Sequence, residues 1–224
     1  MTKLDTLEAS VGQDLEKGKV GRPARTSRQE ILEEATELLR HEGFRAFSMR
    51  RLARRLGTAP TAIYTFYEGK DELLQALAES ALAELWVDCD EVSDWEQGLR
   101  TWMLDFRAKL LEARWLEDLI ALSCSSPALL SGVARLAQLL EHAGLSRRDA
   151  ALMAQNLLWT VLGFVLLELG AEQPDIALGI RQAQRQVGHE QLTEHLALDN
   201  YDSLYEISIE SAIAGVAKRA DQGI

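Results

Sequence analysis

Apolar residues along this chain recur every three to four positions, and few segments alternate with the period of two that marks a β-strand. The clearest stripe comprises Ile31, Leu32, Ala35, Leu38 and Leu39, which fall on one face of a helix. Glycine, proline, serine and asparagine separate successive stripes, as expected where helices begin and end. The pattern therefore predicts an all-α protein.

Capping residues predict where these helices begin, because a serine hydroxyl before a helix accepts a hydrogen bond from a first-turn amide. The predicted starts are Ser27 with Glu30, Ser48, Ser93 with Glu96, Ser126 before Pro127, and Ser146 with Asp149. Further helices are predicted to begin near Lys70 and Tyr201, and Gly43 and Gly57 are predicted helix ends.

The segment from Ser146 to Gly170 is the most apolar predicted helix and is long enough to cross a bilayer. Gln155, Asn156 and Glu168 interrupt it, however. A helix that is apolar on all sides is also expected where protein covers both of its faces. We therefore expect a core helix that a second subunit covers, and no membrane partner.

Charge is distributed unevenly along the chain. The formal net charge is -11, yet residues 17–70 hold 12 Lys and Arg against 6 Asp and Glu. From residue 71 onward, 11 basic residues face 25 acidic ones. A basic block ahead of an acidic body indicates that one end of the molecule meets phosphate and the other does not.

Between Ser48 and about Thr65 the pattern predicts two short helices joined by a turn at Gly57. Ile63 anchors the second helix on the first, so that its other face projects from the surface. A projecting helix of this size fits the major groove of B-DNA.

The basic arm ahead of it, residues 17–25, contains Gly-Arg-Pro. This motif suits either a minor-groove contact or a solvated tail that acts through charge alone.

Three motifs carry a resemblance to a known family. They are Leu52-Ala53-x-x-Leu56-Gly57, Ile63-Tyr64-x-x-Tyr67 and Lys70-Asp71-Glu72-Leu73-Leu74. From near Ser27 to Leu82 the chain resembles the DNA-binding domain of the TetR family of repressors. Ala59 and Tyr67 depart from that family, which often has Ser and Phe at these positions, so the recognition helix lacks its usual capping side chain.

The resemblance implies three regions: a flexible basic arm over 1–26, a helix-turn-helix DNA-binding domain over 27–82, and a ligand-binding and dimerisation domain over 83–224. It implies a cytoplasmic homodimeric repressor that a small hydrophobic or amphipathic ligand releases from a near-palindromic operator in double-stranded DNA. The implied DNA contacts are Arg25, Ser48, Arg50, Pro60, Thr61, Ala62, Tyr64, Thr65, Phe66 and Lys70.

Aromatic and apolar residues of the body are either core or the wall of a ligand cavity, and the apolar faces of its last two long helices suit a dimer interface. The candidate ligand residues are Trp102, Phe106, Trp115, Leu119, Met153, Asn156 and Trp159. The candidate interface residues are Leu162, Val165, Leu166, Leu204, Ile209, Ile213 and Val216. Asn156 has an alternative role, as a polar group that bonds across the subunit interface.

The sequence contains no recognisable motif for catalysis or for binding a metal or a cofactor. His189 and His195 are six residues apart, a spacing that does not stack two ligands on one helix face, and the order Ser-His-Asp is absent. Cys89 and Cys124 are expected to be buried thiols. Two alternatives are weighed against the ligand-released repressor: a DNA-binding regulator controlled by a protein partner without a ligand pocket, and a helical enzyme with an incidental basic head.

Overall fold

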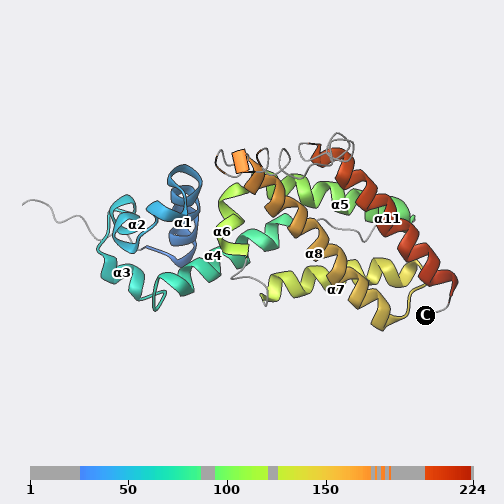
Figure 1. Ribbon diagram of the computed structural model, residues 1–224. Coiled ribbons are helices and arrows are strands. Elements are labelled where there is room, and N and C mark those ends of the chain that lie inside the picture. The colour runs from blue at the N-terminus through green and yellow to red at the C-terminus, as the bar shows by residue number, and fades with distance from the viewer. Residues whose placement is uncertain are drawn as a thin grey trace, which may run out of the picture.

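The computed structural model describes residues 26–86, 94–120, 126–172 and 200–222, with isolated positions 175, 178, 179 and 182 between the last two ranges. Within these ranges every regular element is a helix, which confirms the predicted all-α class. A small helical head lies at one end of the molecule, and one helix joins it to a larger helical body (Figure 1).

The head comprises α1 (Arg28–Glu42), the 3-10 turn η1 (Phe44–Ala46), α2 (Met49–Arg55) and α3 (Pro60–Tyr64). The predicted capping box at the start of α1 is confirmed: the Glu30 amide donates to Ser27 Oγ at 3.1 Å, and the Ser27 amide donates to Glu30 Oε2 at 2.8 Å. Gly43 ends α1 with a φ of 76°, a conformation that favours glycine. Ile31, Leu38 and Leu52 meet in the core of the head.

Helix α4 (Lys70–Leu85) joins the head to the body. Its first half contributes Leu73 and Leu77 to the core of the head, and Leu82 near its end belongs to the core of the body. Trp86 follows as its C-cap, with extended backbone at φ -62° and ψ 137°. A movement of either end of α4 is therefore transmitted to the other through one rigid helix.

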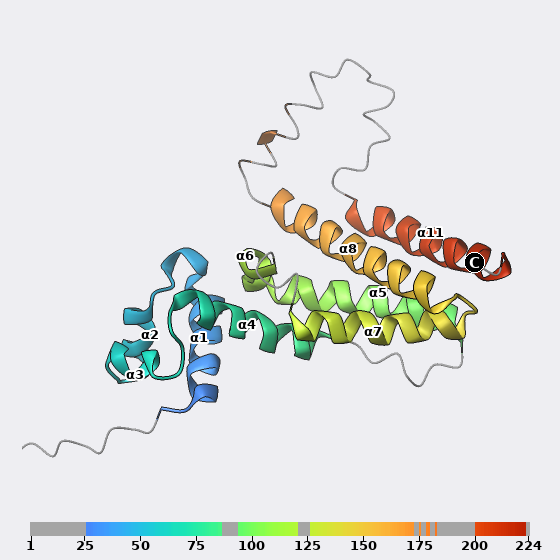
Figure 2. The ribbon, with the colours of Figure 1, turned by 90° about the horizontal axis from the view of Figure 1, so that it is seen from below.

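The body comprises α5 (Trp95–Glu112), η2 (Arg114–Leu116), α6 (Glu117–Ile120), α7 (Pro127–His142), α8 (Arg147–Ala171) and α11 (Tyr201–Asp221). Helices α8 and α11 lie side by side, with α5 and α7 beneath them (Figure 2). The predicted serine caps at Ser126 and Ser146 are confirmed, since each hydroxyl accepts a hydrogen bond from a backbone amide in the first turn of its helix.

The predicted start of α5 at Ser93 is wrong. Asp94 is the N-cap, and its carboxylate accepts a hydrogen bond from the Glu96 amide at 3.0 Å. The physical reason is that aspartate caps a helix as well as serine does, and Asp94 stands directly before the first helical residue. Ser93 itself lies outside the described residues.

A partly buried ion-pair cluster fastens α11 to α5 and α8. Two guanidinium nitrogens of Arg107 donate to the Glu168 carboxylate at 3.0 and 2.9 Å, and one also donates to Asp202 at 2.7 Å. The Arg107 guanidinium lies 4.8 Å from the centre of the Tyr205 ring. Burial raises the pKa of Tyr205, whose hydroxyl donates to the Met103 carbonyl at 2.7 Å.

Among the described residues, α8 is one helix that length and composition would allow to cross a membrane. Its inner face packs in the body core through Ala154, Leu158 and Val161. Core helices of ordinary globular proteins have the same length and composition, so this feature is weak evidence for a membrane span.

The cores of the head and the body do not divide at a single point in the sequence. Leu116 and Leu119, which follow α5 by sequence, are buried in the core of the head with Leu73 and Leu77. Trp115 and Ile120 pack against the same cluster. The η2–α6 corner of the body therefore packs against the head, in addition to α4, which joins the two.

Candidate DNA interface and effector region

The turn between α2 and α3 sets the angle at which α3 leaves the head. Gly57 has a φ of 62°, which favours glycine, and the Thr58 amide bonds back to the Ala53 carbonyl at 2.9 Å. Ile63 is fully buried and anchors α3 on the core, as the sequence predicts. No side chain caps α3 at Ala59, so the expected absence of the usual cap is confirmed.

The outer face of α3 is small and lightly polar. Thr61 and Thr65 are exposed, and the Tyr64 ring is 49% exposed. Pro60, Ala62 and Phe66 are half-buried. The Thr65 hydroxyl already donates to the Ala62 carbonyl at 2.6 Å, which leaves its methyl group and its oxygen lone pairs for an outside partner. The face offers more apolar contact than hydrogen bonding.

The four arginines of α2 divide into two pairs. Arg51 and Arg55 turn back to α1, where Arg51 pairs with Glu42 and Arg55 with Glu34, and the hydrogen bond to Glu34 raises the pKa of Arg55. Arg50 and Arg54 are exposed and have no carboxylate partner within the described ranges. Arg50 and Arg54 are therefore the uncompensated charges of α2.

Ser48 and Lys70 hold positions at the starts of two helices. The Ser48 hydroxyl accepts the Arg51 amide at 3.3 Å and so caps α2. Lys70 Nζ donates to the Phe47 carbonyl at 3.4 Å and lies 4.9 Å from the centre of the Phe44 ring. Lys70 thus braces the head from within, in addition to any role at a phosphate. Arg25 lies outside the described residues.

The seven candidate ligand residues do not lie in one place. Trp102 and Phe106 are buried in the body core. Met153 and Asn156 line a shallow cavity of about 260 Å³ beside Arg219 of α11. Trp159 is 61% exposed on the outer face of α8. The structure therefore brings Trp102 and Phe106 together; Met153 packs against the same core, whereas Trp159 is exposed.

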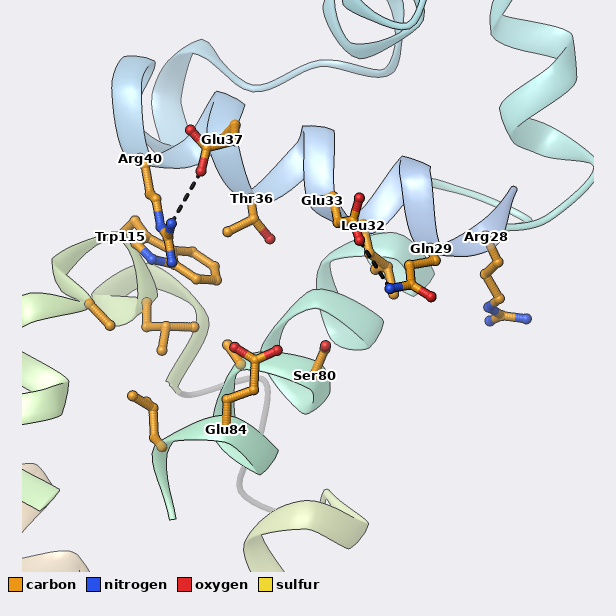
Figure 3. Close-up of a pocket in the computed structure, with 14 residues that line it drawn as sticks. Arg28, Gln29, Leu32, Glu33, Thr36, Glu37, Arg40, Ser80, Glu84 and Trp115 are labelled. Carbon is orange, nitrogen blue, oxygen red and sulfur yellow. Dashed lines mark hydrogen bonds and ion pairs between the residues drawn. The ribbon is translucent and has the colours of Figure 1, made fainter. Parts of the chain in front are cut away.

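The remaining two candidates, Trp115 and Leu119, lie at the junction of head and body. Leu119 is fully buried in the core of the head. Trp115 lines a groove of about 610 Å³ between α1 and α4 (Figure 3). Glu37 and Arg40 of α1, which form an ion pair at 3.1 Å, face this groove, and Glu84 of α4 reaches toward it from the other side. A movement of α4 would change the width of the groove.

The candidate dimer residues also divide. Val165, Ile209 and Val216 are fully buried between α8, α11 and the body core, so they cannot contact a partner subunit. Leu162 and Ile213 are half-buried, and Leu166 and Leu204 are exposed. The sequence pattern identified the apolar helices correctly but not which of their faces points inward, since both faces are apolar.

Exposed apolar residues that the sequence reasoning missed extend the outer face of α8. They are Leu152 and Leu167. Ile207 of α11, which belongs to the apolar surface that the sequence predicts for the last helix, is 62% exposed. Leu152, Trp159 and Leu166 are seven residues apart, and Leu204, Ile207 and Ser211 follow at spacings of three and four, so each set shares one helix face. The seven-residue spacing is the signal that could have found Leu152.

Three further residues were missed because their roles depend on contacts distant in sequence. Trp86 packs on Gly132 of α7. Glu79 of α4 accepts a hydrogen bond from the Ala128 amide, in the first turn of α7, at 2.6 Å. The glutamate places negative charge at the positive end of the α7 dipole. Nothing in the local pattern around Gly132 or Glu79 indicates these contacts.

Two family models match this chain. Bacterial regulatory proteins of the tetR family match residues 31–77, and the tetracyclin repressor-like C-terminal domain matches residues 89–220. A transcriptional regulator of the helix-turn-helix type from Saccharopolyspora erythraea is 28% identical over 176 residues, which cover 76% of this chain and 69% of the relative.

Solved structures share the whole architecture. Apo ActR from Streptomyces coelicolor aligns with a TM-score of 0.73 and 25% identity, covering 90% of this chain and 99% of ActR. The complex of ActR with (S)-DNPA aligns with a TM-score of 0.70 and 25% identity, covering 88% of this chain and all of that one. The fold and the arrangement of α2 and α3 thus define a helix-turn-helix DNA-binding transcriptional regulator. Since the family models match more than half of its residues, the chain belongs to the TetR family, as the motifs predicted.

Proposed function

We propose that this protein is a repressor that binds a near-palindromic operator as a homodimer and releases it when a small apolar ligand enters the body. The observation that carries the proposal is the division of the α2 arginines. Arg51 and Arg55 are neutralised by α1, while Arg50, also on α2, is exposed and has no carboxylate partner among the described residues. This arrangement concentrates unpaired positive charge where a helix would enter the major groove.

Base readout at this interface relies on few hydrogen bonds. Arg50 is the proposed partner of a guanine edge or a nearby phosphate, and Ser48 and Tyr64 are proposed backbone contacts. Pro60, Thr61 and Ala62 offer methyl and methylene groups that suit thymine methyls. We therefore expect the shape and deformability of the operator to carry much of its specificity.

Dimerisation is proposed through the outer face of α8 and α11. Trp159 and Ile207 are each more than 60% exposed on this face, and α8 has no charged side chain between Asp149 and Glu168. A soluble monomer rarely exposes so many apolar side chains on one surface. Two α8–α11 pairs would pack as a four-helix bundle and hold two heads about one DNA turn apart, roughly 34–36 Å.

The interface has a direct test by charge insertion. Trp159→Glu is expected to convert the dimer to a monomer by analytical ultracentrifugation and to abolish tight operator binding, since one head makes only half of the contacts. Leu130→Glu is the matched control, because Leu130 is 60% exposed but lies on α7. A dimeric Trp159→Glu protein would contradict the interface.

The DNA face is tested by paired arginine variants on an operator selected from genomic fragments. Arg50→Ala is expected to lower affinity by about 1–3 kcal/mol and to relax sequence preference if Arg50 reads a base. If it meets a phosphate, the salt slope falls by about 0.9 instead. Arg55→Ala is the control and should leave the slope unchanged, since Arg55 is bound to Glu34. Equal effects of the two variants would contradict the proposal.

Release by a ligand is supported by the path of α4 through both cores and by the relative ActR, whose structure is known with (S)-DNPA. The required coupling is modest, about 1–3 kcal/mol, for a 5- to 150-fold loss of operator affinity. Screening for small molecules that raise the apparent dissociation constant of the operator complex tests it. Binding of such molecules without any effect on operator affinity would contradict release.

A further inference from the structure

Trp86, the C-cap of α4, places its side chain in the core of the body. Its side chain is only 8% exposed, and its ring centre lies 5.9 Å from that of Trp102 and 5.0 Å from that of Phe106. The three rings are nearly parallel, with interplanar angles of 14–22°. Offset stacking at such distances is favourable, so the rings form one stack between α5 and α7.

The Trp86 indole also packs closely against Gly132 of α7. A methyl group at position 132 would lie 1.6 Å from Cε2 and 1.9 Å from Cζ2 of Trp86. No side chain larger than hydrogen fits there while the indole is in place. We call the space enclosed by Trp102, Phe106 and Gly132, which Trp86 now fills, the indole slot. Its walls suit a flat bicyclic ring.

Hydrogen bonding inside the slot is incomplete. The indole Nε1 atoms of Trp86 and Trp102 are both buried, and neither has an acceptor among the described residues. Buried N–H donors without acceptors are costly and rare in folded proteins. Ring stacking in the slot is therefore favourable, but its buried indole N–H groups have no acceptor within the described part of the chain. A ligand with an acceptor atom would supply one.

We propose that the indole slot is the binding site for a flat bicyclic aromatic ligand that carries a hydrogen-bond acceptor and displaces Trp86. The ligand stacks on Phe106 and Trp102 and accepts from Trp102 Nε1. Trp86 leaves the core and takes the end of α4 with it, because the indole directly follows the last helical residue. The effect on DNA rests on the proposed repressor function, whereas occupancy of the slot does not.

Coumarin, a bicyclic lactone, is the probe for a calorimetric titration of the full-length protein. Trp86→Ala is expected to bind coumarin about tenfold more tightly than the wild type, because the indole no longer competes for the slot. Apolar cavities of about 150 Å³ already bind aromatic rings. Naphthalene, which lacks an acceptor, should bind the variant more weakly than coumarin.

The matched control is Trp95→Ala, since Trp95 is only partly buried against the same core and lies outside the stack. It should bind coumarin no more tightly than the wild type. Equal coumarin affinity of Trp86→Ala and the wild type would overturn the slot.

Gly132→Ala tests the same idea without removing the indole. The added methyl is expected to expel Trp86, which a 5-fluorotryptophan label reports as a shift of the Trp86 fluorine resonance to its solvent-exposed position. Operator affinity should fall about 5- to 150-fold without ligand. The substitution should cause no further loss in a Trp86→Ala background. A buried Trp86 resonance in Gly132→Ala with unchanged operator affinity would overturn the inference.

The two proposals can fail separately. Tighter coumarin binding by Trp86→Ala, together with unchanged operator affinity in Gly132→Ala despite an exposed Trp86, would support the slot and contradict release by a ligand. Loss of operator affinity in Gly132→Ala with no gain of coumarin affinity in Trp86→Ala would overturn the slot as a ligand site.

Discussion

Leucine and isoleucine side chains fill most of the interior of the head, whereas three stacked aromatic rings occupy the centre of the body. The buried Tyr67 of the head has a partner for its hydroxyl, which donates to the Arg28 carbonyl at 3.4 Å. The buried Trp86 and Trp102 of the body have none for their indole nitrogens within the described ranges. Trp115, which packs against the head at its junction with the body, also has a buried indole nitrogen without an acceptor in those ranges. The unpaired indole nitrogens therefore lie in the body and at its junction with the head, whereas the buried tyrosine hydroxyl inside the head is paired.

The largest expected effect of a substitution lies in the body, at the ion-pair cluster. Arg107→Ala should lower the free energy of unfolding by about 3–5 kcal/mol, because it leaves Glu168 with a buried and unpaired charge. The side chains of Arg107 and Glu168 are only 11% and 17% exposed. Urea denaturation measures the loss.

Arg100→Ala is the matched control for that prediction. Arg100 also joins α5 to α11, through Glu206 and Glu210, but these carboxylates are well exposed. Its removal should cost no more than about 1 kcal/mol. Equal losses for the two variants would mean that burial of Arg107 has no energetic consequence.

A similar loss is expected in the head from Ile63→Ala, about 2–5 kcal/mol, because Ile63 is fully buried and anchors α3. Hydrogen exchange monitored by mass spectrometry should find the α2–α3 segment unprotected in this variant, with α7 and α8 unchanged. Uniform loosening of head and body together would contradict their separate cores.

A smaller effect is expected where the two regions meet. Glu79→Gln keeps the shape of the side chain but removes the charge at the N-terminus of α7, so it should cost about 0.5–1 kcal/mol of stability. Because Glu79 bonds α4 to α7, operator affinity should change along with stability. Thermal unfolding and operator binding, measured on the same preparation, check both; a change in neither would show that this contact does not join the regions.

An effect of comparable size is expected within the head alone. Ser27→Ala removes the hydroxyl that accepts the Glu30 amide and should cost about 1 kcal/mol, without changing the body. Thermal denaturation of the full-length protein measures it. A loss as large as that of Ile63→Ala would contradict a role confined to the cap.

The sequence predicted the head better than the body, for a physical reason. Ser27, Gly43, Gly57 and Ile63 act through residues three to five positions away or through one adjacent helix, so a local pattern contains the information. The placement of Trp86 on Gly132 depends on which faces of distant helices meet, and no periodicity records that choice.

Dependence on contacts between distant helices also explains why some candidate site residues were placed wrongly from the sequence. Val165, Ile209 and Val216 look like interface residues because α8 and α11 are apolar on both faces, and the structure alone assigns them to the inner one. Trp115 and Leu119 follow α5 directly, yet the η2–α6 corner carries them to the head. Arg50 is exposed, as a DNA contact must be, but the pairing of Arg51 and Arg55 with α1 required the fold.

The decisive measurement is hydrogen exchange of the wild-type protein with and without its selected operator. Bound operator should slow exchange in residues 48–66, which contain α2, the turn and α3, and should leave the middle of α8 unchanged. Slowed exchange confined to the body, with residues 48–66 unaffected by bound DNA, would contradict it.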